Sequence, residues 1–150
     1  MTRIINTIKL NKKIAYLQEL KLLNKESGLI FNSLDNILND FIGHKLFTIL
    51  KFDKINSNLE RIYTSNSKDY PLQGKKDVIR NFWQVQVLEK GIAYIGYNSQ
   101  DIKNSFSDFD LIKKLGCSSV LIIPVKSGGN IKGSVNLLHK ESWYSNNHVE

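Results

Sequence analysis

The sequence predicts an α+β fold, with one central antiparallel sheet and helices on both of its faces. Three observations lead to this prediction. The first forty residues place apolar side chains at helical spacing, the period then changes to the two-residue alternation of strands, and hairpins and helical segments follow to the end of the chain. The 150 residues, 41% of them hydrophobic, are enough for one domain with one core.

We therefore interpret residues 1–150 as a single domain with three parts. Residues 8–43 form an N-terminal helical pair, and residues 44–140 form the sheet with its further helices. Residues 141–150 are a C-terminal tail or the start of a final helix, for which Ser145 is the candidate cap.

The N-terminal pair is predicted from two apolar stripes. Leu10, Ile14 and Leu17 indicate a first helix over residues 8–24. A second stripe runs from Ile30 to Phe41, and Gly43 follows where a C-terminal cap is expected.

The first hairpin follows directly. Residues 46–52 alternate as a strand that is partly buried on both faces, and Asn56-Ser57-Asn58 supplies turn residues. Residues 59–65 form the return strand. Residues 66–76, which contain Gly74, are predicted to be a loop.

A third helix is predicted to run to Lys90, with Asp77 as its cap and Gly91 as its stop. A short strand over residues 92–97 and a helical segment over residues 99–115 come next, and Gly116 ends that segment.

The last hairpin is the plainest signal in the sequence. An apolar strand over residues 118–125 is followed by Ser127-Gly128-Gly129-Asn130 and by a return strand over residues 131–139.

Composition narrows the classes of function. The net charge is +7, but 18 of the 21 basic residues are lysines and no segment concentrates them, so we interpret them as solvated surface charge and expect no nucleic-acid partner. No apolar run approaches the ~18 residues of a membrane span, and no signal peptide is evident. One cysteine, Cys117, excludes an internal disulfide and a cysteine-cluster metal site. We expect a cytoplasmic protein with no membrane partner, cofactor or metal.

Two segments carry a resemblance to a known family. Residues 115–125, Leu-Gly-Cys-Ser-Ser-Val-Leu-Ile-Ile-Pro-Val, and residues 133–139, Gly-Ser-Val-Asn-Leu-Leu-His, resemble consecutive motifs of the GAF domains, which are small-molecule sensor domains. The resemblance covers residues 12–150 and extends to small stand-alone bacterial GAF proteins. It implies a five-stranded sheet in the order 2-1-5-4-3, with the terminal helices on one face and a ligand pocket under the third and fourth helices on the other.

The known chemistries of that family are not supported by this sequence. Free methionine sulfoxide reductases of this fold need several cysteines, whereas Cys117 is alone after a helix end and is interpreted as a packing residue. The bilin-binding cysteine and histidine have no counterpart in residues 105–109. Of the cyclic-nucleotide motif only the lysine remains, as Lys140.

Aromatic residues gather between residues 70 and 109, and small-ligand pockets are mostly apolar and aromatic with a few polar groups. We expect the pocket under the loop 66–76 and the helices 78–90 and 99–115, against strands 92–97 and 118–125. The predicted ligand-binding residues are Tyr70, Trp83, Tyr94, Tyr97, Phe106, Asp108, Ser118, Ser119, Asn136 and His139. Each aromatic also has a plain interpretation as core packing. Strand alternation puts Asn136 and His139 on opposite faces, so at most one of them faces the pocket unless a bulge intervenes.

The function predicted from these observations is a GAF-type small-molecule-binding or sensor module without catalytic activity of its own. One alternative is a dimerisation or scaffold domain whose pocket is filled by its own side chains. The other is a small enzyme on the same fold, with Asp108 or His139 in the active site. A homodimer through the N-terminal helices is expected, because the first helix carries more apolar positions than one stripe can bury.

Overall fold

The computed structural model describes residues 2–23 and 26–149 and separates into two compact units, Met1–Gly43 and His44–Glu150. The first unit is a pair of helices, α1 (Thr2–Leu22) and α2 (Ser27–Phe41). Helix α1 begins earlier than residue 8, and residue 24, where it was expected to end, lies outside the described residues. Gly43 ends α2 as predicted: its φ is +91°, and its backbone N–H donates to the Leu38 carbonyl at 2.9 Å.

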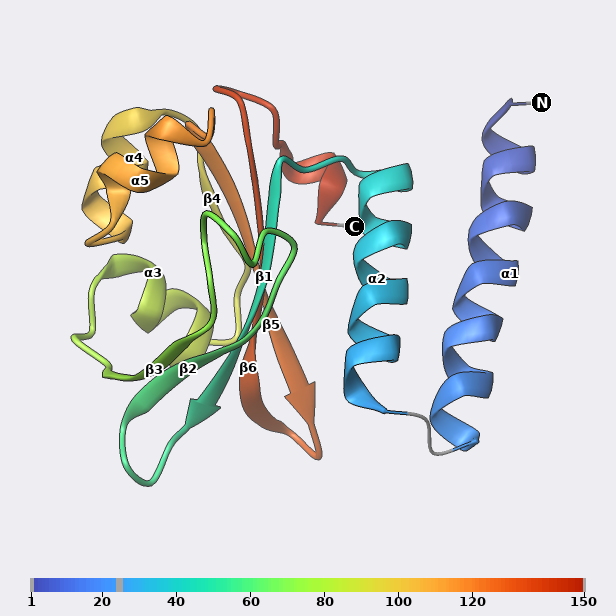
Figure 1. Ribbon diagram of the computed structural model, residues 1–150, viewed down its shortest axis with the longest axis horizontal. Coiled ribbons are helices and arrows are strands. Elements are labelled where there is room, and N and C mark those ends of the chain that lie inside the picture. Colours follow the sequence, from blue (N-terminus) through green and yellow to red (C-terminus); the bar gives the residue numbers. More distant parts are fainter. Residues whose placement is uncertain (1, 24–25, 150) are drawn as a thin grey trace. The chain divides into compact units, whose positions relative to one another are not determined.

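The second unit contains one antiparallel sheet of six strands in the order β3-β2-β1-β6-β5-β4 (Figure 1). The strands are β1 (Leu46–Asp53), β2 (Asn58–Thr64), β3 (Gln73–Asp77), β4 (Tyr94–Gly96), β5 (Ser119–Ser127) and β6 (Asn130–His139). Two hairpins build most of it, β1–β2 and β5–β6, and they are joined where β1 pairs with β6. The antiparallel α+β fold predicted from the sequence is confirmed.

The prediction of five strands was wrong. Strand β3 begins in the segment 66–76 predicted to be a loop and ends at Asp77. It adds to the edge of the sheet by pairing with β2, where Asn58 lies opposite Asp77 and Leu59 opposite Lys76. The other five strands lie in the order β2-β1-β6-β5-β4, so the expected order was incomplete at this edge. The sequence Gln-Gly-Lys-Lys-Asp has no apolar alternation, because an edge strand is held by backbone hydrogen bonds. Its lysines are typical of an edge that must not pair further.

The third helix also differs from the prediction. The chain stays extended through Asp77, so this residue caps nothing. The helical segment begins at Phe82 instead, where the side chain of Asn81 accepts from the Gln84 N–H at 3.1 Å. A short α-helix, α3 (Phe82–Gln84), runs directly into a π-helical turn, η1 (Val85–Glu89).

The segment 99–115 is two helices rather than one. Helix α4 (Ser99–Ser105) is capped by Asn98 and ends where Phe106 adopts an extended conformation, and α5 (Phe109–Lys114) follows. Gly116, with φ of +80°, turns the chain into β5. Near the C-terminus the described residues contain only a short 3-10 helix, η2 (Asn146–His148), capped by Ser145. Glu150 lies outside the described residues.

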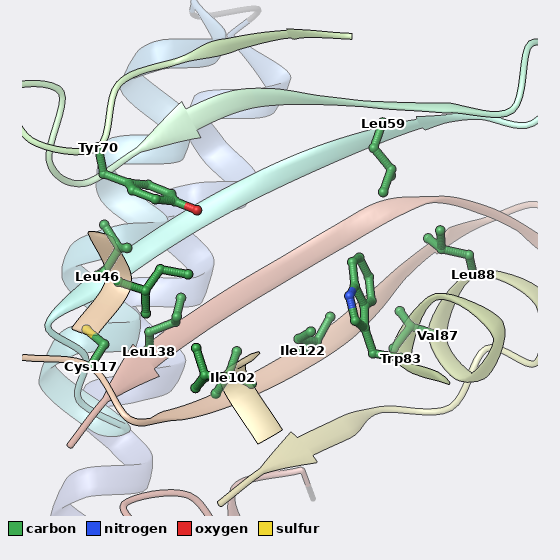
Figure 2. Packing of buried hydrophobic residues seen from close by; sticks show 12 residues of the cluster. Leu46, Leu59, Tyr70, Trp83, Val87, Leu88, Ile102, Cys117, Ile122 and Leu138 are labelled. Atoms are coloured by element: carbon green, nitrogen blue, oxygen red, sulfur yellow. The ribbon is translucent and has the colours of Figure 1, made fainter. Parts of the chain in front are cut away.

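Helices α3, α4 and α5 lie on one face of the sheet (Figure 1). Between them and the sheet is the core, to which β1, β5 and β6 contribute Leu46, Val120, Ile122 and Leu138. Figure 2 shows Leu46, Ile122 and Leu138 on the strands, on the side of the sheet that faces Trp83, Val87 and Ile102 of the helical layer. That the N-terminal helices cover the opposite face stays a prediction.

Candidate functional site

A cavity of about 270 Å³ opens between the helical layer and one half of the sheet. Its floor is formed by β1, β2 and β6, its sides by α3 and the segment 105–108, and its rim by β3 and the chain that follows it. The residues around it are Thr48, Leu50, Leu59, Arg61, Tyr70, Gln73, Gly74, Lys76, Asp77, Ile79, Asn81, Trp83, Gln84, Ser105, Phe106, Ser107, Asp108, Ile112, Asn136 and Leu138.

This cavity lies over a different half of the sheet from the one on which the sequence placed the pocket. No residue of β4 or β5 lines this cavity, although strands 92–97 and 118–125 were expected to form its floor. The reason is packing: Val120 and Ile122 of β5 are fully buried in the core, so this half of the sheet is filled. The loop 66–76 and the helical segments do surround the cavity, as expected.

The floor of the cavity is polar at its centre. Thr48 of β1 lies directly opposite Asn136 of β6, and both point to the helix-covered face. Asn136 is only 2% exposed, and its side-chain oxygen accepts from the Ser134 hydroxyl at 2.8 Å. Apolar residues at these two positions would fill the core without needing hydrogen-bond partners. This polar pair therefore indicates a surface that can contact a polar group.

A charged group forms a second polar wall. Arg61 of β2 is 9% exposed, and its guanidinium lies 3.8 Å from the centre of the Tyr70 ring. Its Nη1 donates to the Pro71 carbonyl at 2.7 Å, and its Nη2 lies 3.7 Å from Oδ2 of Asp108. Burial raises the pKa of the Tyr70 hydroxyl, and the nearby Asp108 carboxylate raises it further, whereas Arg61 lowers it. Tyr70 is therefore neutral at physiological pH.

The aromatic wall is held in place by one carbonyl. The Trp83 indole N–H donates to the Ser105 carbonyl at 3.0 Å, and the Asn81 amide donates to the same oxygen at 3.1 Å. The Trp83 ring lies 6.0 Å from that of Phe106, centre to centre. These contacts tie α3 to the end of α4, so the indole is a fixed apolar surface and its polar N–H is already used.

The rim is exposed and carries both positively and negatively charged side chains. Lys76, Asp77 and Ile79 follow one another along it, and Ser107 lies at the opposite side. Arg80, next in the chain, has an unusual φ of +51° and forms a two-pronged ion pair with Glu89 of η1 at 2.6 and 3.0 Å. This pair fixes the point at which the rim joins the helical layer.

Of the predicted ligand-binding residues, five lie around the cavity and five do not. Around it are Tyr70, Trp83, Phe106, Asp108 and Asn136. Tyr94 and Tyr97 border a separate shallow hollow beside Phe82 and Ile92, near the β4 edge, and Tyr97 is largely exposed.

Ser118, Ser119 and His139 belong to the junction between α5, β5 and β6. The Ser118 backbone N–H donates to the His139 carbonyl, and the Ser119 hydroxyl donates to the Lys140 carbonyl at 2.7 Å. The His139 ring stacks on Trp143, with centres 3.9 Å apart. Strand alternation turns Ser119 and His139 away from the face that carries Val120 and Leu138. They hold the end of the hairpin together and do not line the cavity.

Cys117 is a core residue, 1% exposed, and burial raises the pKa of its thiol to about 11. Its thiol is therefore protonated at neutral pH. Within residues 2–23 and 26–149, no group of three or more His, Cys, Asp or Glu side chains is placed to hold a metal ion. No helix in this described part of the chain is both long and apolar enough to cross a membrane.

The sequence analysis missed Arg61, Thr48 and Gln84. Arg61 had a signal: it is one of three arginines in a lysine-rich chain, and it lies two residues from Leu59 on the same face of a predicted strand. Thr48 is an ordinary strand residue by composition. Gln84, whose side-chain oxygen accepts from the Ile79 N–H at 2.9 Å, acquires its place from the turn that precedes α3.

Comparison with known proteins identifies the fold. A scan against protein-family models finds no match, and no curated protein matches the sequence. Solved structures do match. The GAF domain of a two-component sensor histidine kinase from Bacillus halodurans is 14% identical, with a TM-score of 0.66 over 83% of this chain and 84% of that one.

Two further solved structures widen the comparison. The phycocyanobilin-bound GAF domain of a cyanobacterial phytochrome is 12% identical, with a TM-score of 0.69 over 93% and 85% of the two chains. The type II free methionine-R-sulfoxide reductase from Thermoplasma acidophilum is 12% identical, with a TM-score of 0.53 over 71% and 68%. These matches show that the chain has the fold of a GAF domain.

Proposed function

We propose that the chain is a cytoplasmic sensor module that binds a small molecule in the cavity between the sheet and helices α3 to α5, without catalytic activity of its own. One observation carries this proposal: a cavity of about 270 Å³ has buried polar side chains, among them Arg61 and Asn136, next to apolar side chains such as Leu59 and Trp83. Small-ligand sites have this composition. The phytochrome domain of the same fold is a solved structure with a bound phycocyanobilin, which supports the use of this fold for small ligands.

The alternatives receive less support. A scaffold domain with a self-filled pocket would place apolar side chains where Thr48 and Asn136 lie. A thiol-based enzyme would need a reactive cysteine, whereas the Cys117 thiol is buried and its pKa is raised. Asp108 remains the candidate acid for an enzyme on this fold, and turnover of a bound metabolite would favour that alternative over a sensor.

A screen of metabolites by thermal shift, followed by blocking of the cavity, tests the proposal. A ligand that binds the folded state raises the melting temperature by mass action. Ser107 is exposed at the rim, so Ser107→Trp closes the mouth without touching the core. It should abolish the shift, whereas Ser127→Trp, an equal change at the exposed end of β5, should leave it intact. A shift that survives Ser107→Trp would place the ligand elsewhere.

We also propose that two copies pair through the N-terminal helices. Within the described part of α1, the apolar side chains Ile8, Ile14, Tyr16 and Leu22 are exposed. Light scattering of the full chain at tens of micromolar should give twice the 17.2 kDa monomer mass. Ile14→Glu with Tyr16→Glu should return the chain to a monomer with the sheet intact by near-UV circular dichroism, and a monomeric parent chain would contradict the proposal.

A further inference from the structure

Buried Arg61 and partly buried Asp108 form an ion pair whose hydrogen bonds are incomplete. Nη2 of Arg61 and Oδ2 of Asp108 are 3.7 Å apart, which is within range for an ion pair but too long for a hydrogen bond. Among the described residues, Nε of Arg61 and Oδ2 of Asp108 are buried and have no hydrogen-bond partner. Buried charged groups are normally both paired and hydrogen-bonded, so this arrangement is costly unless it has a use.

The position of Arg61 does not depend on Asp108. The guanidinium is fixed by the Pro71 carbonyl at 2.7 Å and by the face of the Tyr70 ring. Tyr70 is fixed in turn, because its carbonyl accepts from the Thr64 hydroxyl at 2.7 Å. Asp108 lies opposite, at the start of α5, and its side chain makes no cap hydrogen bond to that helix. Two opposite charges are therefore held side by side by separate elements.

The charges select the kind of ligand that this wall can accept. A simple anion that approached Arg61 would be repelled by Asp108, and a simple cation that approached Asp108 would be repelled by Arg61. A ligand that carries a carboxylate and an ammonium group on the same carbon satisfies both. The carboxylate accepts from the guanidinium, and the ammonium donates to the Asp108 carboxylate, which gives charge-assisted hydrogen bonds on each side.

The apolar part of the cavity determines which kind of group can be attached to the charged head of the ligand. Leu59, Trp83, Ile112 and Leu138 line it, so the group attached to the charged head meets an apolar surface. We propose that the site binds a free α-amino acid with an apolar side chain, with its carboxylate at Arg61 and its ammonium group at Asp108. This inference rests on the function proposed above and names the ligand class for the same cavity.

Isothermal titration of the full chain tests the charged head directly. The probes are L-leucine, L-methionine and L-phenylalanine, each compared with the acid that lacks the amine and the amine that lacks the carboxylate. For leucine these are 4-methylpentanoate and 3-methylbutylamine. At least one amino acid should bind with submillimolar Kd, and its two analogues should bind at least tenfold more weakly. Equal binding of the acid and the amino acid would overturn the inference.

The variant Asp108→Asn adds a test whose expected result differs from that of a variant that fails to fold. It should weaken amino-acid binding at least tenfold, while binding of the amine-free acid should hold or improve because a repelling carboxylate is gone. Asp110→Asn is the matched control on α5, since Asp110 does not line the cavity, and it should change neither affinity. The inference is overturned if Asp108→Asn leaves amino-acid binding unchanged, or if it weakens the amino acid and the amine-free acid alike.

The two proposals can fail separately. If none of the three amino acids binds, the proposed ligand class is overturned. The sensor function is still supported if another metabolite raises the melting temperature of the parent chain but not that of Ser107→Trp. Failure of every compound in the wider screen would overturn both.

Discussion

The two halves of one sheet face differ, although the same helical layer covers both. On β5, Val120 and Ile122 are completely buried and pack against Val87 and Ile102. On β1, β2 and β6, the same face carries Thr48, Arg61 and Asn136, and a cavity lies over them. Ile122 and Asn136 are direct neighbours across β5 and β6, so the boundary falls between two adjacent strands.

The half with the cavity is packed less closely than the filled half. A filled half gains stability from close packing, and each missing methylene is felt there. The half with the cavity gives up this packing, and its buried polar groups must be hydrogen-bonded to be tolerated. A region of the core that is less stable for this reason is a candidate binding site. Four experiments test the difference between the two halves.

The largest effect is expected from Ile122→Ala, in the filled half. The side chain is fully buried, and truncation should lower the free energy of unfolding by about 2–5 kcal/mol because it leaves a cavity. Urea denaturation followed by Trp fluorescence measures it. A loss below about 1 kcal/mol would show that this half is not filled.

The reactivity of Cys117, also in the filled half, should be strongly suppressed. With its thiol pKa raised from 9.0 to about 11 by burial, the thiolate fraction at pH 8 falls roughly a hundredfold. Labelling by a thiol reagent should therefore be at least that much slower in the native chain than in urea. Rapid native labelling would mean that this part of the core opens readily.

Asn136→Leu probes the half with the cavity. Alone it should cost about 1–3 kcal/mol, because the buried Ser134 hydroxyl loses the oxygen to which it donates. Adding Ser134→Ala should recover most of that loss, since both polar partners are then gone. If urea denaturation finds the double variant no more stable than the single one, the loss in Asn136→Leu does not come from the unpaired Ser134 hydroxyl.

The smallest effect concerns His139, one of the ligand-binding candidates named from the sequence. Burial lowers its pKa, and the positive charges of Lys45 and Lys140 lower it further. The unfolded chain then binds the proton more tightly, so the contribution of this histidine to stability is present above about pH 6.5 and is lost as the pH falls below it. His139→Gln should flatten the melting temperature between pH 7 and pH 5 and leave ligand binding unchanged, since the residue does not line the cavity.

The periodicity of the sequence determined most of the fold. Alternation in residues 46–52 and 118–125 predicted β1 and β5, and Gly43 and Gly116 marked helix ends at positive φ. These signals are local, because apolar spacing and glycine freedom act within a few residues. The resemblance of residues 115–125 and 133–139 to GAF motifs pointed to the fold that the solved structures match.

Only the tertiary structure decided where the cavity lies and which residues face it. Strand β3 has no side-chain pattern, because its pairing with β2 uses backbone groups alone. Asp108 is far from Arg61 and Tyr70 in sequence, and only the packing of the helical layer on the sheet brings the three together. The sequence could propose Tyr70 and Asp108 from residue type. Whether a polar side chain meets a cavity or a packed neighbour depends on how the helical layer fills the sheet face, and that is a property of the assembled core.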